Sequence, residues 1–313
     1  MTQAPPFSTA PAHNSVLAGV AQAGCVCRVK PPASPAAGGK GAPARGVVKL
    51  VLCFLGATLS LAAQADQPLW ELGLGVGGLR LPHYRGSDQS HDLLLPTPYA
   101  VYRGKIFRAT REGARAVLLD SDRFDLDVSV RASAPTRSAD NAARSGMADL
   151  APTLELGPNL NSTLARGATW KLDLRLPVHA VFTLQRQSRS LGWTATPVLN
   201  FDLRWQGWSL GAQAGPIWAT RPYHAYFYDV SAADATTSRA AYGARGGFSG
   251  WRWTAGASRR LGPLWVGGFV RGDSVAGAAF EASPLVRQRE QVSLGLAMSW
   301  VFAVSNERVA VDD

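Results

Sequence analysis

Several segments of the chain alternate strictly between apolar and polar or small residues, and this period of two is the strongest constraint on its fold. In 124–131 every second residue is apolar, and 170–176, 201–205 and 292–300 follow the same rule. Alternation over about 8–11 residues is typical of strands with one apolar and one polar face. No helical stretch of comparable length is visible. The sequence therefore predicts an all-β fold.

Two architectures produce such strands, a soluble β-sandwich and a transmembrane barrel with a polar lumen. Charged residues such as Asp127 and Asp173 recur at strand centres, where a barrel would place them in its lumen. Aromatic residues such as Trp70, Trp205 and Trp300 stand near strand ends, as the interfacial girdles of a barrel require. Both features favour a closed, transmembrane antiparallel β-barrel.

Tight turns and longer connections alternate regularly along the chain, which gives a strand count. Twelve strands are expected, with ten as the fallback, because a barrel with both ends in the periplasm needs an even number. The longer connections are all expected on the outer side. The expected strands are 70–81, 93–103, 105–109, 112–119, 124–134, 149–157, 168–182, 191–205, 208–218, 250–260, 264–271 and 289–302. The longer connections are 82–92, 135–148, 183–190, 219–249 and 272–288.

The N-terminal part of the chain indicates export. Segment 45–65 combines a basic start, a short apolar centre and an Ala-x-Ala end, which predicts a signal peptide cleaved after Ala65. Segment 1–44 is interpreted as a disordered leader or an over-long start, 66–302 as the barrel and 303–313 as a polar tail. All three cysteines lie before Ala65, so the exported chain needs no oxidative folding. The predicted location is the outer membrane of a Gram-negative cell.

The net charge of +10 falls to +5 when the five basic residues of 1–65 are removed. This charge is spread evenly and forms no basic stripe, so nucleic-acid binding is not expected. The arginine pairs Arg259/Arg260 and Arg287/Arg289 are interpreted either as contacts to lipopolysaccharide phosphates or as ordinary lumen and rim charges. Outer-membrane lipid and lipopolysaccharide are the expected surroundings.

The connection 82–92 brings together serine, histidine and aspartate residues, so acyl-transfer chemistry is one hypothesis for it. Ser87 with His83 or His91 would be the reacting pair, but a mobile polar loop lacks the fixed neighbours that such catalysis needs. No G-x-S-x-G motif occurs in the chain. The two histidines have no third ligand at a spacing suited to zinc. No catalytic residue, metal site or cofactor is predicted.

The connection 219–249 is rich in aromatic residues and is the best candidate for a contact surface. Exposed aromatic residues in a long loop often mark a recognition site. An inward-folded plug or a strand extension is the alternative, and the sequence leaves both open. The candidate contact residues are Tyr223, Tyr226, Phe227, Tyr228 and Tyr242.

Short motifs spread in order over 70–302 resemble one known family. They include 72–77, 82–88, 96–99, 144–150, 154–158, 226–230, 239–242 and 283–286. Together they resemble the MltA-interacting protein (MipA/OmpV) family of outer-membrane proteins. The motif positions expected to be structural are Tyr84, Gly86, Ser87, Gly146, Met147, Gly157, Pro158, Ser283 and Pro284.

The resemblance implies an outer-membrane barrel without enzymatic activity or cofactor. It implies a scaffold that brings a murein-cleaving lytic transglycosylase together with a murein-synthesising penicillin-binding protein. A pore for small solutes or a surface adhesin is the alternative, and a lipid-modifying barrel enzyme comes third. A periplasmic partner is expected to meet the short turns, the segment 157–168 or the tail 303–313.

Overall fold

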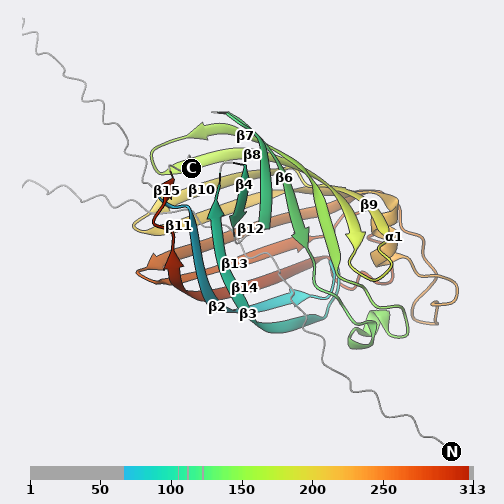
Figure 1. The fold of residues 1–313 in the computed structure, drawn as a ribbon. Coiled ribbons are helices and arrows are strands. Elements are labelled where there is room, and N and C mark those ends of the chain that lie inside the picture. Colours follow the sequence, from blue (N-terminus) through green and yellow to red (C-terminus); the bar gives the residue numbers. More distant parts are fainter. Residues whose placement is uncertain (1–66, 105, 111–112, 122, 310–313) are drawn as a thin grey trace, which may run out of the picture.

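The computed structural model describes residues 67–309 except 105, 111–112 and 122. The leader 1–44, the signal peptide at 45–65 and its cleavage site lie outside the described residues and stay predictions. The described chain forms a closed, twelve-stranded antiparallel barrel, as predicted (Figure 1). β9 and β10 together form one of the twelve wall strands, because both pair with β8 on one side and with β11 on the other.

The wall strands follow one another around the barrel in chain order. Their bounds are β2 (Trp70–Pro82), β3 (Ser90–Arg103), β4 (Phe107–Thr110), β5 (Gly113–Asp120), β6 (Phe124–Ala132), β7 (Thr153–Arg166), β8 (Trp170–Thr183), β9 (Ser190–Ala195), β10 (Val198–Trp205), β11 (Trp208–Ala219), β12 (Gly247–Leu261), β13 (Leu264–Ser274) and β14 (Glu290–Val304). The remaining elements are β1 (Gln67–Pro68), β15 (Arg308–Val309), α1 (Arg221–Tyr228), η1 (Ser138–Asp140) and η2 (Ala142–Arg144).

The alternation of the sequence becomes an apolar outer wall and a polar lumen. Leu94 and Leu296 point outward and are 78% and 73% exposed, whereas Asp127 and Asp173 point inward and are buried. Aromatic residues gather at both ends of the wall. Trp208 and Trp218 lie at opposite ends of β11, about 33 Å apart along the strand. A strand tilt of about 40° reduces this height to about 25 Å, which matches the apolar band of an outer-membrane barrel.

The two ends of the barrel differ in their connections. One end carries the short turns and both ends of the described chain, and there β1 pairs with β15. The other end carries the longer connections 83–89, 133–152, 184–189, 220–246 and 275–289. Short turns face the periplasm in bacterial barrels, so these ends are called the periplasmic end and the outer end. No helix of the described residues is long and apolar enough to cross a membrane.

The structure corrects three expectations about elements. β7 covers Thr153–Arg166 rather than 149–157, so most of 157–168 is wall rather than a periplasmic connection. A Gly-Pro pair often marks a turn, but the ladder between β7 and β8 passes over Gly157 and Pro158 and continues at Asn159. The eight-residue helix α1, with proline in its first turn, was not expected. β14 continues to Val304 into the segment expected to be tail, and β15 follows.

Candidate functional site: the outer cap and the lumen

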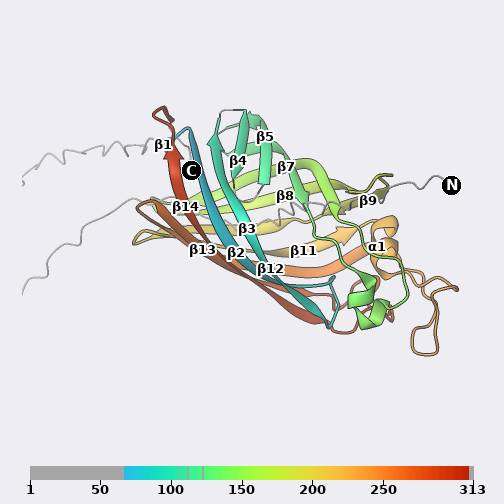
Figure 2. The same ribbon diagram turned by 60° about the horizontal axis from the view of Figure 1, so that its bottom comes forward.

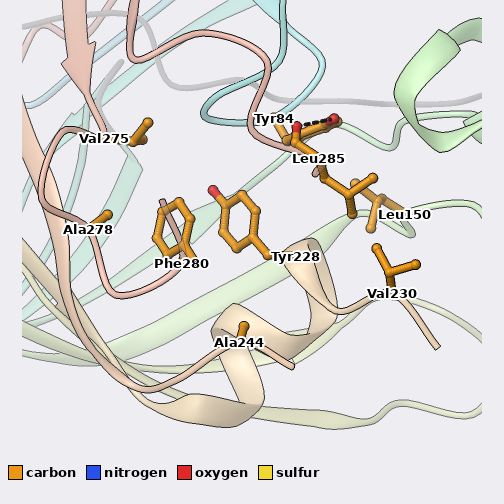
Figure 3. Close-up of a cluster of buried hydrophobic side chains, with 9 residues drawn as sticks. All are labelled: Tyr84, Leu150, Tyr228, Val230, Ala244, Val275, Ala278, Phe280 and Leu285. Atoms are coloured by element: carbon orange, nitrogen blue, oxygen red, sulfur yellow. Dashed lines mark hydrogen bonds between the residues drawn. The ribbon is translucent and has the colours of Figure 1, made fainter. Parts of the chain in front are cut away.

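Four of the outer connections fold together into one structure, here called the outer cap (83–89, 133–152, 220–246 and 275–289). The cap has its own apolar core, drawn in Figure 3. Val275, Phe280 and Leu285 are at most 1% exposed, which is the burial of a protein interior. The buried members of this core are Tyr84, Leu150, Tyr228, Val230, Ala244, Val275, Ala278, Phe280 and Leu285.

Tyrosines join the cap segments to one another. Tyr228, at the end of α1, stacks on Phe280, and Tyr84 meets Tyr228 edge-on with ring centroids 6.3 Å apart. The hydroxyl of Tyr84 donates to the carbonyl oxygen of Leu285 at 2.8 Å, and that of Tyr228 donates to the carbonyl oxygen of Arg85 at 2.9 Å. Burial raises the pKa of Tyr84 to about 12. Both hydroxyls therefore stay protonated donors at neutral pH.

The five aromatic residues proposed as contacts all lie in this cap, but they do not form an exposed surface. Tyr228 is buried, and Tyr223, Tyr226, Phe227 and Tyr242 are half-buried. Their placement fits the inward-folded alternative, since α1 packs against β9 at the outer mouth. Contact with a partner or ligand at these residues stays a prediction.

Most motif positions contribute hydrogen bonds or packing to the cap. The backbone N–H of Gly86, at a φ of 92°, donates to Oε1 of Gln291 at 3.0 Å. Oγ of Ser283 donates to the carbonyl oxygen of Tyr228 at 2.8 Å. Met147 packs against the cap core. Pro284 is half-buried next to Ser283.

The other motif positions have different surroundings. Gly146 has a φ of 81°, which favours glycine, and a Cβ there would meet nothing within 4 Å. Gly157 and Pro158 lie in the wall, on β7, rather than in the cap. A Cβ on Gly157 would collide with the backbone of Val178 and His179 on β8. Pro158 points outward and is exposed.

The connection after β2 packs into the cap, which corrects the expectation of a plain polar turn. Ser87 is fully buried; its Oγ donates to the carbonyl oxygen of Gln89 and accepts from Nδ2 of Asn141, each at 3.0 Å. The rings of His83 and His91 stack with centroids 5.2 Å apart. The hydroxyl of Ser87 is thus engaged by neighbours other than the histidines. The described residues contain no group of three or more His, Cys, Asp or Glu side chains placed to hold a metal ion.

A layer of charged side chains lies in the lumen directly beneath the cap. Oδ1 of Asp273 accepts from Nε of Arg85 at 2.8 Å and from Nε of Arg252 at 2.9 Å, so one carboxylate joins cap and wall. The charged neighbours of Tyr223 on α1 include Arg252 and Asp273, which places this ring at the top of the layer. Nε of Arg271, by contrast, is buried without a hydrogen-bond partner among the described residues.

A serine, a histidine and a glutamate also meet in the lumen. Oγ of Ser129 on β6 lies 2.9 Å from Nε2 of His179 on β8, and Nδ1 of that histidine lies 3.8 Å from Oε2 of Glu155 on β7. The contact among these three residues was not predicted from the sequence. Alternation places each residue on the lumen face, but it does not show which lumen residues of three strands meet.

Packed side chains also occupy the periplasmic half of the lumen. Tyr99, Val101, Trp265 and Val301 form a second apolar cluster there. Glu71 accepts from Nη2 of Arg103 at 2.6 Å and from Nη1 of Arg260 at 2.8 Å. Arg260, one of the arginines with two alternative interpretations, thus forms an ion pair in the lumen. Its neighbour Arg259 lies over the ring of Trp208.

A hollow lies on the lipid-facing wall. It has a volume of about 810 Å³ and crosses the wall from β11 to β3. Small residues such as Gly78 and Gly268 form its floor, and Leu94 and Leu296 form part of its rim. Its lining is apolar, so it suits hydrocarbon rather than water.

Comparison with solved structures finds other outer-membrane barrels. The chain is similar to the COG4313 outer membrane channel from Pseudomonas putida F1, with 14% identity, a TM-score of 0.38 and coverage of 74% of this chain and 96% of that chain. It is similar to a bacterial polysaccharide outer membrane secretin, with 9% identity, a TM-score of 0.37 and coverage of 74% and 99%. It is also similar to outer membrane phospholipase A from Escherichia coli, with 10% identity, a TM-score of 0.30 and coverage of 74% of this chain and 93% of that chain. The comparison with curated proteins finds no match.

The family comparison covers almost the whole barrel. The model of the family described as MltA-interacting protein MipA matches residues 74–302, from β2 to β14 with the cap included. This match confirms the resemblance noted in the sequence. The closed barrel, its apolar outer wall and its aromatic ends agree with an outer-membrane protein. The chain therefore belongs to the family of MltA-interacting protein MipA and is an outer-membrane β-barrel protein.

Proposed function

We propose that the chain is an outer-membrane interaction protein that holds a lytic transglycosylase and a penicillin-binding protein together at its periplasmic end. The family description, MltA-interacting protein, supports an interaction partner. The observation that carries the proposal is the difference between the two ends of the barrel. The outer mouth contains a cap with its own buried core, whereas the connections that the structure describes at the periplasmic end are short turns.

Hydrogen bonds join the first and last described segments, 67–70 and 305–309, at the periplasmic surface. The backbone N–H of Leu69 donates to the carbonyl oxygen of Glu307, and that of Ser305 donates to the carbonyl oxygen of Trp70, each at 2.9 Å. Nη1 of Arg103 donates to the carbonyl oxygen of Pro68 at 2.9 Å. A fixed surface loses little conformational entropy when a partner binds, which favours a docking role.

An exposed apolar patch lies beside this surface. Ile106, in the turn after β3, is 72% exposed, and the adjacent Leu118 and Leu119 on β5 are 63% and 55% exposed. The backbone N–H of Val117 donates to the carbonyl oxygen of Ile106 at 2.6 Å, so these apolar residues are neighbours. Exposed apolar patches often mark protein contacts. We assign the patch as the first contact for the murein enzymes.

The alternative of a pore for small solutes is less well supported. The cap core at the outer mouth and the second apolar cluster in the periplasmic half both occupy the path that a hydrophilic solute would take. No specific feature of the described residues favours an adhesin.

Photo-crosslinking in intact cells tests the proposal at matched positions. Gln206 and Gln187 are both exposed glutamines, one in a periplasmic turn and one in an outer connection. A photoreactive phenylalanine analogue at Gln206 or at Ile106 is expected to capture a lytic transglycosylase or a penicillin-binding protein, and the same analogue at Gln187 is not. Capture of neither enzyme class at the periplasmic positions, or equal capture at Gln187, would contradict the proposal.

A further inference from the structure

Strand β3 has a free edge over most of its length. β2 pairs with β3 from Ser90 to Tyr102, whereas β4 pairs only with Tyr102 and Arg103. Residues 90–101 have no ladder partner on the β4 side within the part of the chain that the structure describes. Figure 2 shows β4 and β5 gathered beside the periplasmic end of β3. A complete barrel wall has no free edges, so the wall is incomplete along the outer part of β3.

Two prolines lie on this free edge. The backbone N–H of Arg103 donates to the carbonyl oxygen of Leu69, so the odd-numbered backbone groups of β3 point toward β2. The even-numbered groups therefore point toward the free edge, and Pro96 and Pro98 are among them. Proline has no N–H and is confined to strand edges. The edge is thus poorly suited to pairing with a further strand.

The gap in the wall beside 90–101 of β3 is bounded on its other sides by the outer connections, by β4 and β5, and by β6. At the outer end, Oγ1 of Thr136 donates to the carbonyl oxygen of His83 at 2.8 Å, and the N–H of Ala142 donates to Oε1 of Gln89. This bridge ties the connection after β6 to the connection after β2. β4 and β5 lie at the periplasmic end, and β6 lies across from β3. The opening between 90–101 of β3 and the end of β6 is called the side window.

The two sides of the window carry different chemistry. Leu93 and Leu95 of β3 point inward, and Leu94 between them points outward at the rim of the lipid-facing hollow. Arg131 of β6 lies on the other side of the window and follows Val130, the last residue of β6 that pairs with β5. The ladders of β4 and β5 connect Val130 with Tyr102, at the periplasmic end of β3. The β6 side of the window is basic because it carries Arg131, whereas the β3 side is apolar because it carries the leucines.

The lumen behind the window carries an excess of positive charge. Asp273 already binds Arg85 and Arg252. Arg271 and Arg131 form no ion pair among the described residues, although Arg131 has Glu155 opposite it on β7. Because Nε of Arg271 is buried and unpaired, an anion in the lumen would supply the acceptor that it lacks.

We propose that the side window admits an amphiphile with an anionic head group and one apolar tail from the outer leaflet into the lumen. Arg131 and Arg271 bind the head group, and Leu93 and Leu95 contact the tail. The route runs sideways because the cap packs at the outer mouth, and the second apolar cluster narrows the periplasmic half of the lumen. This function is independent of the proposed docking of murein enzymes, which uses the periplasmic end.

Photolabelling of the full barrel in phosphatidylcholine nanodiscs tests the proposal. The probe is palmitate with a diazirine in its tail, and the adducts are mapped by mass spectrometry. We expect adducts at Leu93 and Leu95 that unlabelled palmitate or lysophosphatidate removes and that uncharged hexadecanol leaves in place. The variant Arg131→Gln should need about tenfold more probe, as expected for one lost charge-assisted hydrogen bond. Arg123→Gln, in an exposed periplasmic turn, is the matched control and should label normally.

Two results would overturn the proposal. The first is labelling confined to lipid-facing residues such as Leu72 and Leu296, with equal intensity in the protein and in Arg131→Gln. The second is competition by hexadecanol as strong as that by palmitate, which would show that the anionic head group is not recognised. Heat-dependent migration on a gel confirms that each variant is a folded barrel. If palmitate and lysophosphatidate compete, the stronger competitor shows whether the site prefers a carboxylate or a phosphate head group.

Discussion

The rings of Tyr228 and Phe280 stack with their centroids 3.6 Å apart and their planes 7° from parallel. Tyr228 ends helix α1, and Phe280 belongs to the connection between β13 and β14, so this contact joins two cap segments that are distant in sequence. Stacked aromatic pairs add a specific geometry to the burial of apolar area. The cap is thus a packed structure rather than a set of separate loops.

Replacing Tyr228 by alanine should loosen the cap and leave the barrel wall intact. The substitution removes the stacked ring and the hydrogen bond to Arg85, and large-to-small changes in a core cost about 3–5 kcal/mol. Limited proteolysis should cut the outer connections faster in the variant, while heat-dependent gel migration stays unchanged. Tyr228→Phe, which keeps the ring, should show a much smaller effect. Equal cleavage of the alanine variant and the parent protein would contradict the packed cap.

The carboxylate of Asp273 should be essential for the contact between cap and wall. Asp273→Asn would leave Arg85 and Arg252 without a charged partner, and breaking a buried ion pair costs about 3–5 kcal/mol. Hydrogen–deuterium exchange should rise in 83–89 in this variant. Asp92→Asn, in the exposed pair with Arg80, is the control and should change the exchange little. Equal effects of the two variants would refute the assigned role of Asp273.

The stability of the cap should fall as the pH is lowered. Burial lowers the pKa of His224, with Arg85 adding to the effect and the bond to the carbonyl oxygen of Arg245 opposing it. The ring faces Ser249, Tyr228 and Phe280. The unfolded chain takes up a proton near pH 6.5, whereas the buried ring does not. The stabilising contribution is therefore present above pH 6.5 and is lost as the pH falls through the lower pKa of the folded state.

This pH dependence can be measured from urea unfolding of the purified protein between pH 8 and pH 5. Each histidine that stays neutral when folded adds a slope of about 1.4 kcal/mol per pH unit. Burial also lowers the pKa of His83, so two such histidines lie in the cap. His224→Gln should reduce the slope below pH 6.5, and an unchanged slope would show that His224 is not responsible.

The wall should not tolerate a side chain at Gly157. Because a Cβ there would meet the backbone of Val178 and His179, Gly157→Ala should lower the free energy of unfolding by about 1–3 kcal/mol. Gly78→Ala is the matched control, since a Cβ at Gly78 meets nothing within 4 Å. Urea midpoints of the two variants in detergent provide the comparison. A loss of stability in Gly78→Ala equal to that in Gly157→Ala would be the contrary result.

The wall was predictable from the sequence because the alternation of apolar and polar residues within each strand shows which side faces lipid. Alternation in 124–131 and 292–300 fixes strand type, register and lumen face without any distant contact. The twelve expected strands correspond to the twelve observed, and the largest error among them is the position of β7, where Gly157 and Pro158 were expected to end the strand. The two prolines in 93–103 were an available sign of a free edge.

The cap was not predictable, because its contacts join segments without periodicity. Tyr228 meets Phe280 and Tyr84 across long stretches of sequence, and nothing local in 219–249 distinguishes an inward fold from an exposed surface. The meeting of Ser129 with His179 is equally distant. It depends on the stagger between strands, which single-strand patterns do not contain.

Electrical recording of the purified barrel in planar bilayers tests most directly that the cap fills the outer mouth. We expect no discrete current steps from the parent protein, because packed side chains occupy both ends of the lumen. Tyr228→Ala, with a loosened cap, should give brief openings if the cap is the main barrier. Stable, discrete conductance steps from the parent protein would contradict the capped barrel and favour the pore.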